Sequence, residues 1–141
     1  MAATPPVELG TVAARAARER AGVEGAQIGH VAYGHVINTE PRDMYLSRVA
    51  AMQAGIPDTT PAMNVNRLCG SGPQAIVSYL QLLMLTASHL DLAGGADGMS
   101  RSAFVVPPDR WGQKMGDHNV LDMMRGPLNC QLGTGDRGDT A

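Results

Sequence analysis

The sequence lacks an excess of charge of either sign, since 13 acidic and 11 basic side chains leave a formal net charge of −2. It has no stretch of clustered Lys and Arg, which is the pattern that a nucleic-acid-binding surface shows. Its apolar runs, such as Leu82 to Leu85, are far shorter than the roughly 20 residues that cross a bilayer. We therefore expect neither a nucleic acid nor a membrane among the partners of this chain.

Cysteine is scarce as well, because Cys69 and Cys130 are the only two and can form one disulfide at most. Residues 1–6 have neither the positive charge nor the apolar core of a secretion signal. Without such a signal, free thiols in a reducing compartment are expected. These observations predict a soluble protein of the cytoplasm, with Cys130 as a free thiol in a loop.

The sequence does contain enough apolar material for a packed core, since hydrophobic residues make up 44% and charged residues 17% of its 141 positions. That length is typical of one domain. Helix-like and strand-like segments alternate, with a helix over 4–22, a strand over 30–37, a helix over 40–54, a strand over 62–68, a helix over 73–87 and a strand over 90–95. This alternation indicates an α/β fold with a largely parallel sheet and helices on both faces.

The three expected helices differ in their apolar patterns and end signals. In the first, Thr4 is the expected N-cap and Pro5 the first helical residue. Its apolar positions recur at helical spacing and predict one core-facing side: Leu9, Val12, Ala13, Ala16 and Ala17. Gly55 is expected to end the second helix in a left-handed conformation. The helix over 73–87 is apolar on nearly every side, which predicts that it is buried.

A glycine-rich bend around Cys69 joins the strand over 62–68 to the helix that follows. Gly70 and Gly72 are expected to supply the unusual backbone dihedrals of a sharp turn, and Pro73 fits a first helical turn. Cys69 would then lie at a helix N-terminus, where unpaired N–H groups and the macrodipole favour the thiolate that a nucleophile needs. The alternative is a small buried hydrophobic residue, which is the commoner fate of a cysteine.

The segment from Asn66 to Val77 resembles the nucleophile motif of the thiolases. Met99-Ser100 after Gly94-Gly95, and the run from Asp109 to Gly112, are similar to the same family. The resemblance covers about residues 7–128 and is specifically to bacterial acetoacetyl-CoA and β-ketoacyl-CoA thiolases. It implies a thiolase-like layered fold with a mixed, largely parallel sheet.

The resemblance implies an acyltransferase chemistry centred on Cys69. The Cys69 thiolate would attack an acyl-CoA and hold the acyl group as a thioester, with the backbone N–H of Cys69 as one oxyanion donor. Condensation of acetyl-CoA or thiolysis of a 3-ketoacyl-CoA would follow, as in fatty-acid, ketone-body or polyhydroxyalkanoate metabolism. Coenzyme A would enter as part of the substrate, so no metal and no organic cofactor is expected, and the parent enzyme would be a homo-oligomer.

The resemblance also implies that the chain is an incomplete piece of such an enzyme. Residues 1–100 would be a partial N-terminal core, and residues 101–141 would begin a loop excursion used for substrate binding and subunit contacts. The family has a further strand before the first helix, in the middle of the first sheet, and a second half that holds the activating histidine and a second cysteine. Asp136 and Arg137 replace a histidine and a methionine that lie near the pantetheine arm in the family. The alternative function is therefore a catalytically inactive remnant.

The histidines and the glycine pair have simpler interpretations. His30 and His35 have no companion ligands in the sequence, which indicates structural histidines rather than a metal site. His89 and His118 are the available bases for an unrelated cysteine hydrolase, but neither neighbourhood shows a base with an orienting partner. Gly94-Gly95 fits neither a P-loop nor a dinucleotide fingerprint, so close backbone packing is favoured.

Overall fold

The computed structural model describes residues 2–85, 88–112 and 114–133. The helices and strands are α1 (Pro6–Ala21), β1 (His30–Gly34), α2 (Leu46–Gln53), β2 (Ala62–Val65), α3 (Ser71–Met84), β3 (Asp91–Gly95), β4 (Phe104–Val105), β5 (Leu121–Asp122) and α4 (Arg125–Leu128). Short 3₁₀ helices lie between them: η1 (Gly25–Gln27), η2 (Pro41–Tyr45), η3 (Met99–Arg101) and η4 (Pro107–Arg110). The alternation of helices and strands up to β3 confirms the prediction.

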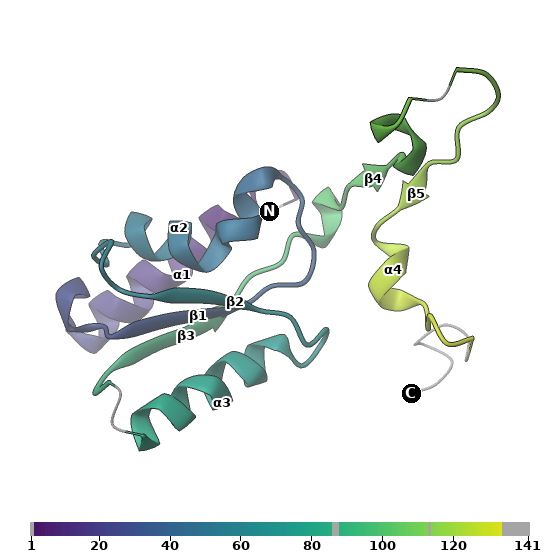
Figure 1. The fold of residues 1–141 in the computed structure, drawn as a ribbon. Coiled ribbons are helices and arrows are strands. Elements are labelled where there is room, and N and C mark those ends of the chain that lie inside the picture. The colour runs from purple at the N-terminus through teal and green to yellow at the C-terminus, as the bar shows by residue number, and fades with distance from the viewer. Residues whose placement is uncertain (1, 86–87, 113, 134–141) are drawn as a thin grey trace.

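The main sheet consists of three parallel strands in the order β2-β1-β3. In its register, Val31 of β1 lies between Ala62 of β2 and Leu92 of β3. Parallel neighbours need crossover connections, and here α2 and α3 fill them. Figure 1 shows α1 and α2 on one face of the sheet and α3 on the other. The α/β fold with helices on both faces is therefore confirmed.

The three strands are direct neighbours, which corrects one expectation. A further strand in the middle of this sheet would have to separate two of them, but β1 pairs with β2 along one side and with β3 along the other. Additional strands can extend this sheet only at the outer edges of β2 and β3. The sequence could not reveal this, because the order of strands depends on how the crossovers pack.

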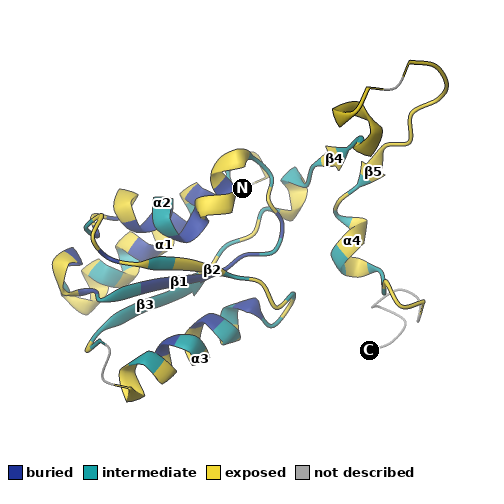
Figure 2. Cartoon of the chain, viewed as in Figure 1, coloured by how far each residue is buried: buried dark blue, intermediate teal, exposed yellow. Residues whose placement is uncertain are grey.

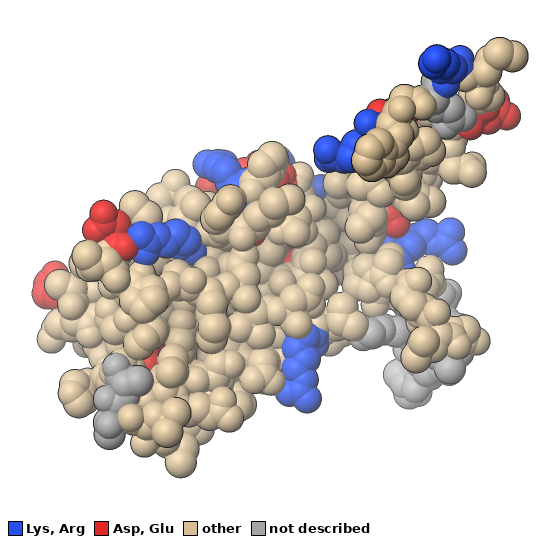
Figure 3. Space-filling model, in the orientation of Figure 1, with Lys and Arg blue, Asp and Glu red and all other residues tan. Residues whose placement is uncertain are grey.

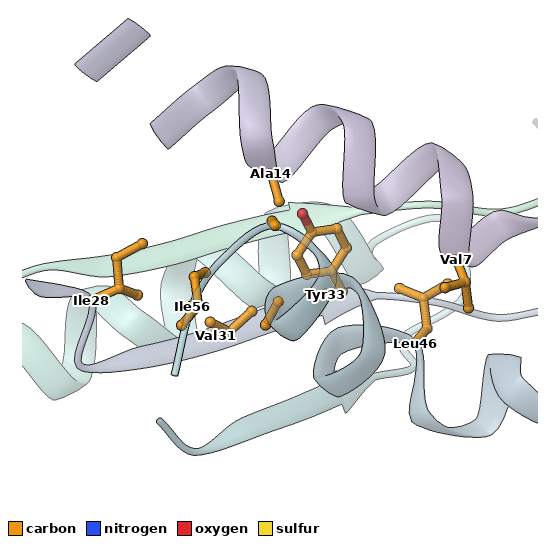
Figure 4. Packing of buried hydrophobic residues seen from close by; sticks show 9 residues of the cluster. Val7, Ala14, Ile28, Val31, Tyr33, Leu46 and Ile56 are labelled. Carbon is orange, nitrogen blue, oxygen red and sulfur yellow. The ribbon is translucent and has the colours of Figure 1, made fainter. Parts of the chain in front are cut away.

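The larger of two hydrophobic clusters lies between the sheet, α1 and α2 (Figure 4). The Tyr33 ring lies within it, its hydroxyl donates a hydrogen bond to the Gly10 carbonyl at 3.0 Å, and burial raises the pKa of Tyr33 to about 12. A Cβ atom at Gly10 would come within 3.2 Å of this ring, so glycine allows α1 to lie close to the sheet. The buried members are Val7, Ala14, Ile28, Val31, Tyr33, Leu46, Ala51, Ala54 and Ile56.

The expected buried side of α1 was wrong. Val12 is 64% exposed, and the buried positions are Pro6, Val7, Gly10, Thr11 and Ala14. This side faces the core because Gly10 lies close to Tyr33, and because the Thr11 hydroxyl donates to Gln53 Oε1 of α2 at 3.0 Å. The helix also begins one residue later than expected, with Pro5 as N-cap and Pro6 as the first helical residue. Because alanines lie all around this helix, spacing alone did not distinguish its sides.

The end of α2 agrees with the sequence. Gly55 has a φ of 84°, and its N–H donates to the Met52 carbonyl at 3.0 Å. The next N–H, of Ile56, donates to the Ala51 carbonyl at 3.0 Å while the Ile56 side chain is buried. This pattern satisfies the last carbonyls of the helix and confirms glycine as the end signal. The beginning differs from the prediction, because residues 41–45 form the 3₁₀ helix η2.

The expectation of a fully buried third helix was wrong for this chain. Only Ser71, Ala75 and Tyr79 of α3 are buried, while Ile76 is 60% and Leu80 is 54% exposed. Figure 2 shows these exposed stretches along the side of α3 that faces away from the sheet. The helix contacts the sheet along one side, and no other described segment covers the remaining sides. Hydrophobic character therefore did not determine burial here, because burial needs a neighbour.

Residues after η3 form an arm that leaves the main sheet (Figure 1). Within it, β4 and β5 pair in antiparallel fashion, with Phe104 opposite Asp122. Arg101 joins the base of the arm to the core by donating to the Ala3 carbonyl at 3.0 Å and to the Glu40 carboxylate at 3.3 Å. The expected departures at 136 and 137 lie outside the described residues.

In the view of Figure 3, Lys and Arg side chains lie singly or in small groups, interspersed with Asp and Glu. Among the described helices, none is both long and apolar enough to cross a bilayer.

Candidate active site

Cys69 lies in the bend between β2 and α3. The strands expected to continue to residues 37 and 68 end at Gly34 and Val65, because the chain leaves the sheet there to form loops. In parallel sheets this carboxyl edge is the usual place for a ligand site. The Cys69 side chain is exposed and its thiol is free, which excludes the alternative of a small buried hydrophobic residue. Cys130 is partly buried, and its sulfur accepts a hydrogen bond from the Leu132 N–H at 3.4 Å.

The backbone of the bend differs from the expected one. Gly70 has a φ of −87°, which any residue can adopt, and Gly72 lies inside α3. The left-handed conformation falls instead on Leu68, with a φ of 48°. Such a conformation is a true outlier for a bulky residue and persists only where the surroundings fix it. The two glycines therefore do not supply the turn, as the sequence had suggested.

Glycine is required one strand away, at Gly34 of β1. A Cβ atom there would lie 2.6 Å from the Gly72 nitrogen and 2.9 Å from the Ser71 Cβ, closer than real atoms approach. The N-terminus of α3 thus lies directly against the end of the central strand. This contact places Cys69 at the carboxyl edge of the sheet, and no pattern in the sequence connects the two segments.

Cys69 lines a cavity of about 350 Å³. The sheet contributes Gly34 and Gly95, and the arm contributes the opposite wall through Met124, Pro127 and Leu128. A second cavity of about 820 Å³ adjoins it and shares Val36, Ile37, Leu68 and Pro127. The larger cavity is lined by Cys130 rather than Cys69, so the smaller one is where chemistry at the exposed thiol would take place.

A polar pair supports the cavity wall. His35 Nδ1 lies 2.7 Å from the Ala96 carbonyl oxygen and 3.2 Å from Asp97 Oδ1. That carboxylate oxygen also accepts hydrogen bonds from the N–H groups of Val36 and Ile37, at 3.0 and 2.9 Å. Burial alone would lower the pKa of His35, but the bonds to Asp97 and Ala96 raise it above its ordinary value. Burial would raise the pKa of Asp97, yet the bonds from His35 and the two loop N–H groups lower it.

The remaining histidines lie away from Cys69. His30 pairs with Asp91 at 3.4 Å, and His89 precedes β3, so both lie at the amino end of the strands. His118 does have an orienting carboxylate, contrary to expectation, since its Nδ1 lies 3.0 Å from Asp109 Oδ1. That pair belongs to the arm and lines neither cavity. Within the described ranges, no group of three or more His, Cys, Asp or Glu residues could hold a metal ion.

Sequence reasoning missed four residues that shape the site. Ser71 and Leu68 form the bend, and the His35–Asp97 pair holds its neighbouring wall. Ser71 stands within the recognised motif, so the motif contained a usable signal. Leu68 had none, because leucine is among the residues least expected in a left-handed conformation.

Comparison with known proteins places these features in context. The family model described as the N-terminal domain of thiolase matches residues 1–141. The beta-ketothiolase BktB of Cupriavidus necator is 52% identical over 124 residues, which are 88% of this chain and 32% of that protein. The acetyl-CoA acetyltransferase of the same organism is 39% identical over 124 residues, 88% of this chain and 31% of that protein.

Solved structures agree with these sequence relatives. The crystal structure of human mitochondrial 3-ketoacyl-CoA thiolase superposes with a TM-score of 0.92 and 31% identity, covering 97% of this chain and 35% of that one. The crystal structure of the Bacillus anthracis acetyl-CoA acetyltransferase superposes with a TM-score of 0.90 and 32% identity, covering 99% of this chain and 35% of that one. The chain thus spans about a third of the length of the proteins it matches.

Proposed function

This chain belongs to the thiolase family, and from that membership we propose that Cys69 is the nucleophile of a coenzyme A-dependent acyl transfer. The observation that carries the proposal is the position of Cys69, a free and exposed thiol before α3 that lines the 350 Å³ cavity. Relatives named beta-ketothiolase, acetyl-CoA acetyltransferase and 3-ketoacyl-CoA thiolase support an acyl-CoA as the substrate.

The first step loads the acyl group onto the protein. The Cys69 sulfur attacks the thioester carbonyl, the bond between that carbon and the coenzyme A sulfur breaks, and coenzyme A leaves with the electron pair and takes up a proton. While the carbon is tetrahedral its oxygen is negative, and the backbone N–H of Cys69 donates to it. The amides that close the bend belong to Gly70 and Ser71, so the Cys69 amide is not used there.

The second step transfers the acyl group onward. In the condensing direction, acetyl-CoA loses a proton from its methyl carbon, the resulting carbanion attacks the acyl carbon, and the bond from that carbon to the Cys69 sulfur breaks as the thiolate leaves. In the cleaving direction, the Cys69 sulfur attacks the 3-keto carbon of a 3-ketoacyl-CoA, the bond from that carbon to C2 breaks, and acetyl-CoA leaves as a carbanion that takes up a proton. Coenzyme A then attacks the acyl group on Cys69 and releases the thiolate. Both directions need a base, and the described residues that line the Cys69 cavity include no histidine. We therefore assign the complete cycle, in a homo-oligomer without a resident cofactor, to the whole protein rather than to these residues alone.

A catalytically inactive remnant is the competing proposal. It is favoured because the described residues that line the Cys69 cavity include no histidine, and a nucleophile without its base loses most of its rate enhancement. The two proposals differ in whether Cys69 accepts an acyl group at all.

The test is to incubate the purified chain with acetyl-CoA that is isotopically labelled in the acetyl group. Trypsin would release Cys69 in peptide 68–101 and Cys130 in peptide 126–137, so that mass spectrometry can locate the label. We expect labelled 68–101, loss of the label in Cys69→Ala, and retention in the matched Cys130→Ser. An unlabelled 68–101 in folded protein would favour the inactive remnant. Acetoacetyl-CoA thiolysis by the chain alone should be unmeasurable.

A further inference from the structure

A single hydroxyl, that of Ser71, forms hydrogen bonds on both sides of Leu68. Ser71 Oγ accepts a hydrogen bond from the Arg67 N–H at 2.8 Å and donates one to the Leu68 carbonyl at 2.6 Å. The Ser71 N–H donates to the same carbonyl at 3.0 Å. Ser71 is only 4% exposed and packs against Gly34, so water has little access to replace these bonds. Ser71 is therefore the buried side chain that holds the carbonyl side of the left-handed Leu68.

These bonds fix the direction of the neighbouring amide as well. The peptide between Leu68 and Cys69 is trans, as are the others described, so its N–H points opposite to its carbonyl. Because the Leu68 carbonyl points at Ser71, the Cys69 N–H points away from the first turn of α3. Among the described residues, no group accepts a hydrogen bond from it. An unpaired N–H next to the exposed thiol is what an oxyanion requires.

We propose that Ser71 is a positioning residue, whose hydroxyl turns the Leu68–Cys69 peptide so that the Cys69 N–H faces the oxyanion of the acyl-transfer step. This inference rests on the proposed function and deepens it, since it concerns the same thiol. Ser71 also lines the Cys69 cavity, but its hydroxyl already donates to the Leu68 carbonyl, so the effect that we assign to it acts through the peptide. Its effect should therefore appear in reactions that develop an oxyanion and not in reactions that lack one.

Two reagents separate these cases at Cys69. With p-nitrophenyl acetate, the sulfur attacks the carbonyl carbon, a negative oxygen develops, and the C–O bond breaks as p-nitrophenolate leaves with the electron pair. With iodoacetamide, the sulfur attacks a methylene carbon and iodide leaves, so no oxyanion forms. We take the ratio of the acylation rate constant to the alkylation rate constant, both measured in a Cys130→Ser background. A change in the reactivity of the Cys69 thiol alters both rate constants, whereas a change in the direction of the Cys69 amide alters only acylation. Neither reagent contains coenzyme A, so the ratio does not depend on coenzyme A binding. If Cys69 accepted no acetyl group from acetyl-CoA, the proposed function would be overturned, but the ratio would be unaffected.

We expect Ser71→Ala to lower the acylation rate constant by about tenfold and to change alkylation by less than about twofold. The fall in acylation is smaller than the roughly 10²–10³-fold cost of removing an oxyanion donor, because the Cys69 amide remains and only its direction changes. The matched control is Ser78→Ala, the same change two turns along α3, where the hydroxyl accepts a bond from Gln74 at 3.3 Å. Its ratio should stay unchanged.

Far-UV circular dichroism first shows whether Ser71→Ala is folded, and only a folded variant is used to test the proposal. If Ser71→Ala loses its helical signal, the exposed Asn66→Ala replaces it, because Asn66 Oδ1 accepts the Leu68 N–H at 3.1 Å and holds the other side of the same residue. That variant should show a smaller fall in the same ratio. An unchanged ratio in the folded variant, or an equal fall of both rate constants, would overturn the proposal.

Discussion

The two faces of the main sheet bury apolar side chains to very different extents. On the α1–α2 face, nine buried residues form one cluster around Tyr33. On the α3 face, the buried cluster consists of Ala32, Ala75 and Tyr79, although α3 is rich in large apolar residues. The first face therefore contains most of the buried core, while the second carries α3, which begins just after Cys69.

The largest difference between the faces should appear when one leucine on each is shortened. Leu46 is fully buried against α1, so Leu46→Ala removes contacts and leaves a cavity that costs about 2–5 kcal/mol. Leu80 is 54% exposed, so Leu80→Ala should change the free energy of unfolding by only about 0.5 kcal/mol. Urea denaturation measures both. Equal losses would show that the α3 face is packed as tightly as the other.

The contact between α3 and the sheet gives the next largest effect. Gly34→Ala would force a Cβ atom against the Gly72 nitrogen and should cost about 1–3 kcal/mol through overpacking. The matched change, Gly72→Ala, meets nothing within 4 Å and should stabilise the helix by about 0.5–1 kcal/mol. Thermal unfolding of both variants checks the pair. A stabilising Gly34→Ala would mean that α3 does not lie against β1 as described.

The His35–Asp97 pair should make stability depend on pH. The lowered pKa of Asp97 gives a contribution that is present above 3.8 and is lost as pH falls through its folded value. The raised pKa of His35 gives one that is present below 6.5 and is lost as pH rises through its folded value. The pair should therefore stabilise the fold most between pH 3.8 and 6.5.

Replacing the carboxylate tests this account. Asp97→Asn should cost about 1.5–3 kcal/mol within that window and flatten both limbs of the stability profile. The exposed Asp58→Asn serves as the control and should leave the profile unchanged. Urea midpoints across the pH range are the measurement. If Asp97→Asn keeps the shape of the wild-type profile, the pair does not produce the pH dependence.

Substitutions on the exposed side of α3 should have the smallest effect on stability, but they should clearly reduce self-association. Exposed apolar surface associates, so the chain should self-associate and bind hydrophobic dyes. Ile76→Glu combined with Leu80→Lys should reduce both, with a change in unfolding free energy of about 0.5 kcal/mol or less. Val12→Glu on α1 is the control, because Val12 is exposed on the opposite face. Sedimentation velocity that shows a monomeric wild-type chain would contradict the expectation.

The sequence predicted local features well and contacts poorly. Periodicity and end signals were enough to predict the strands, the glycine end of α2 and a bend at Cys69, because these depend on residues close in the chain. The buried side of α1 depends on how Gly10 meets Tyr33, and the burial of α3 depends on which neighbours are present. Neither is encoded by spacing. The left-handed Leu68 is likewise imposed by Ser71 and not by the residue itself.

The proposal that Cys69 is an acyl acceptor can be tested most directly by protection within one sample. The chain is treated with acetyl-CoA, then with iodoacetamide, and alkylation of peptides 68–101 and 126–137 is compared by mass spectrometry. Cys69 lies at the beginning of α3 and Cys130 lies in the arm, so the second thiol is an internal control. The account predicts that acetyl-CoA protects Cys69 and leaves Cys130 unaffected. Equal alkylation of Cys69 with and without acetyl-CoA would contradict it.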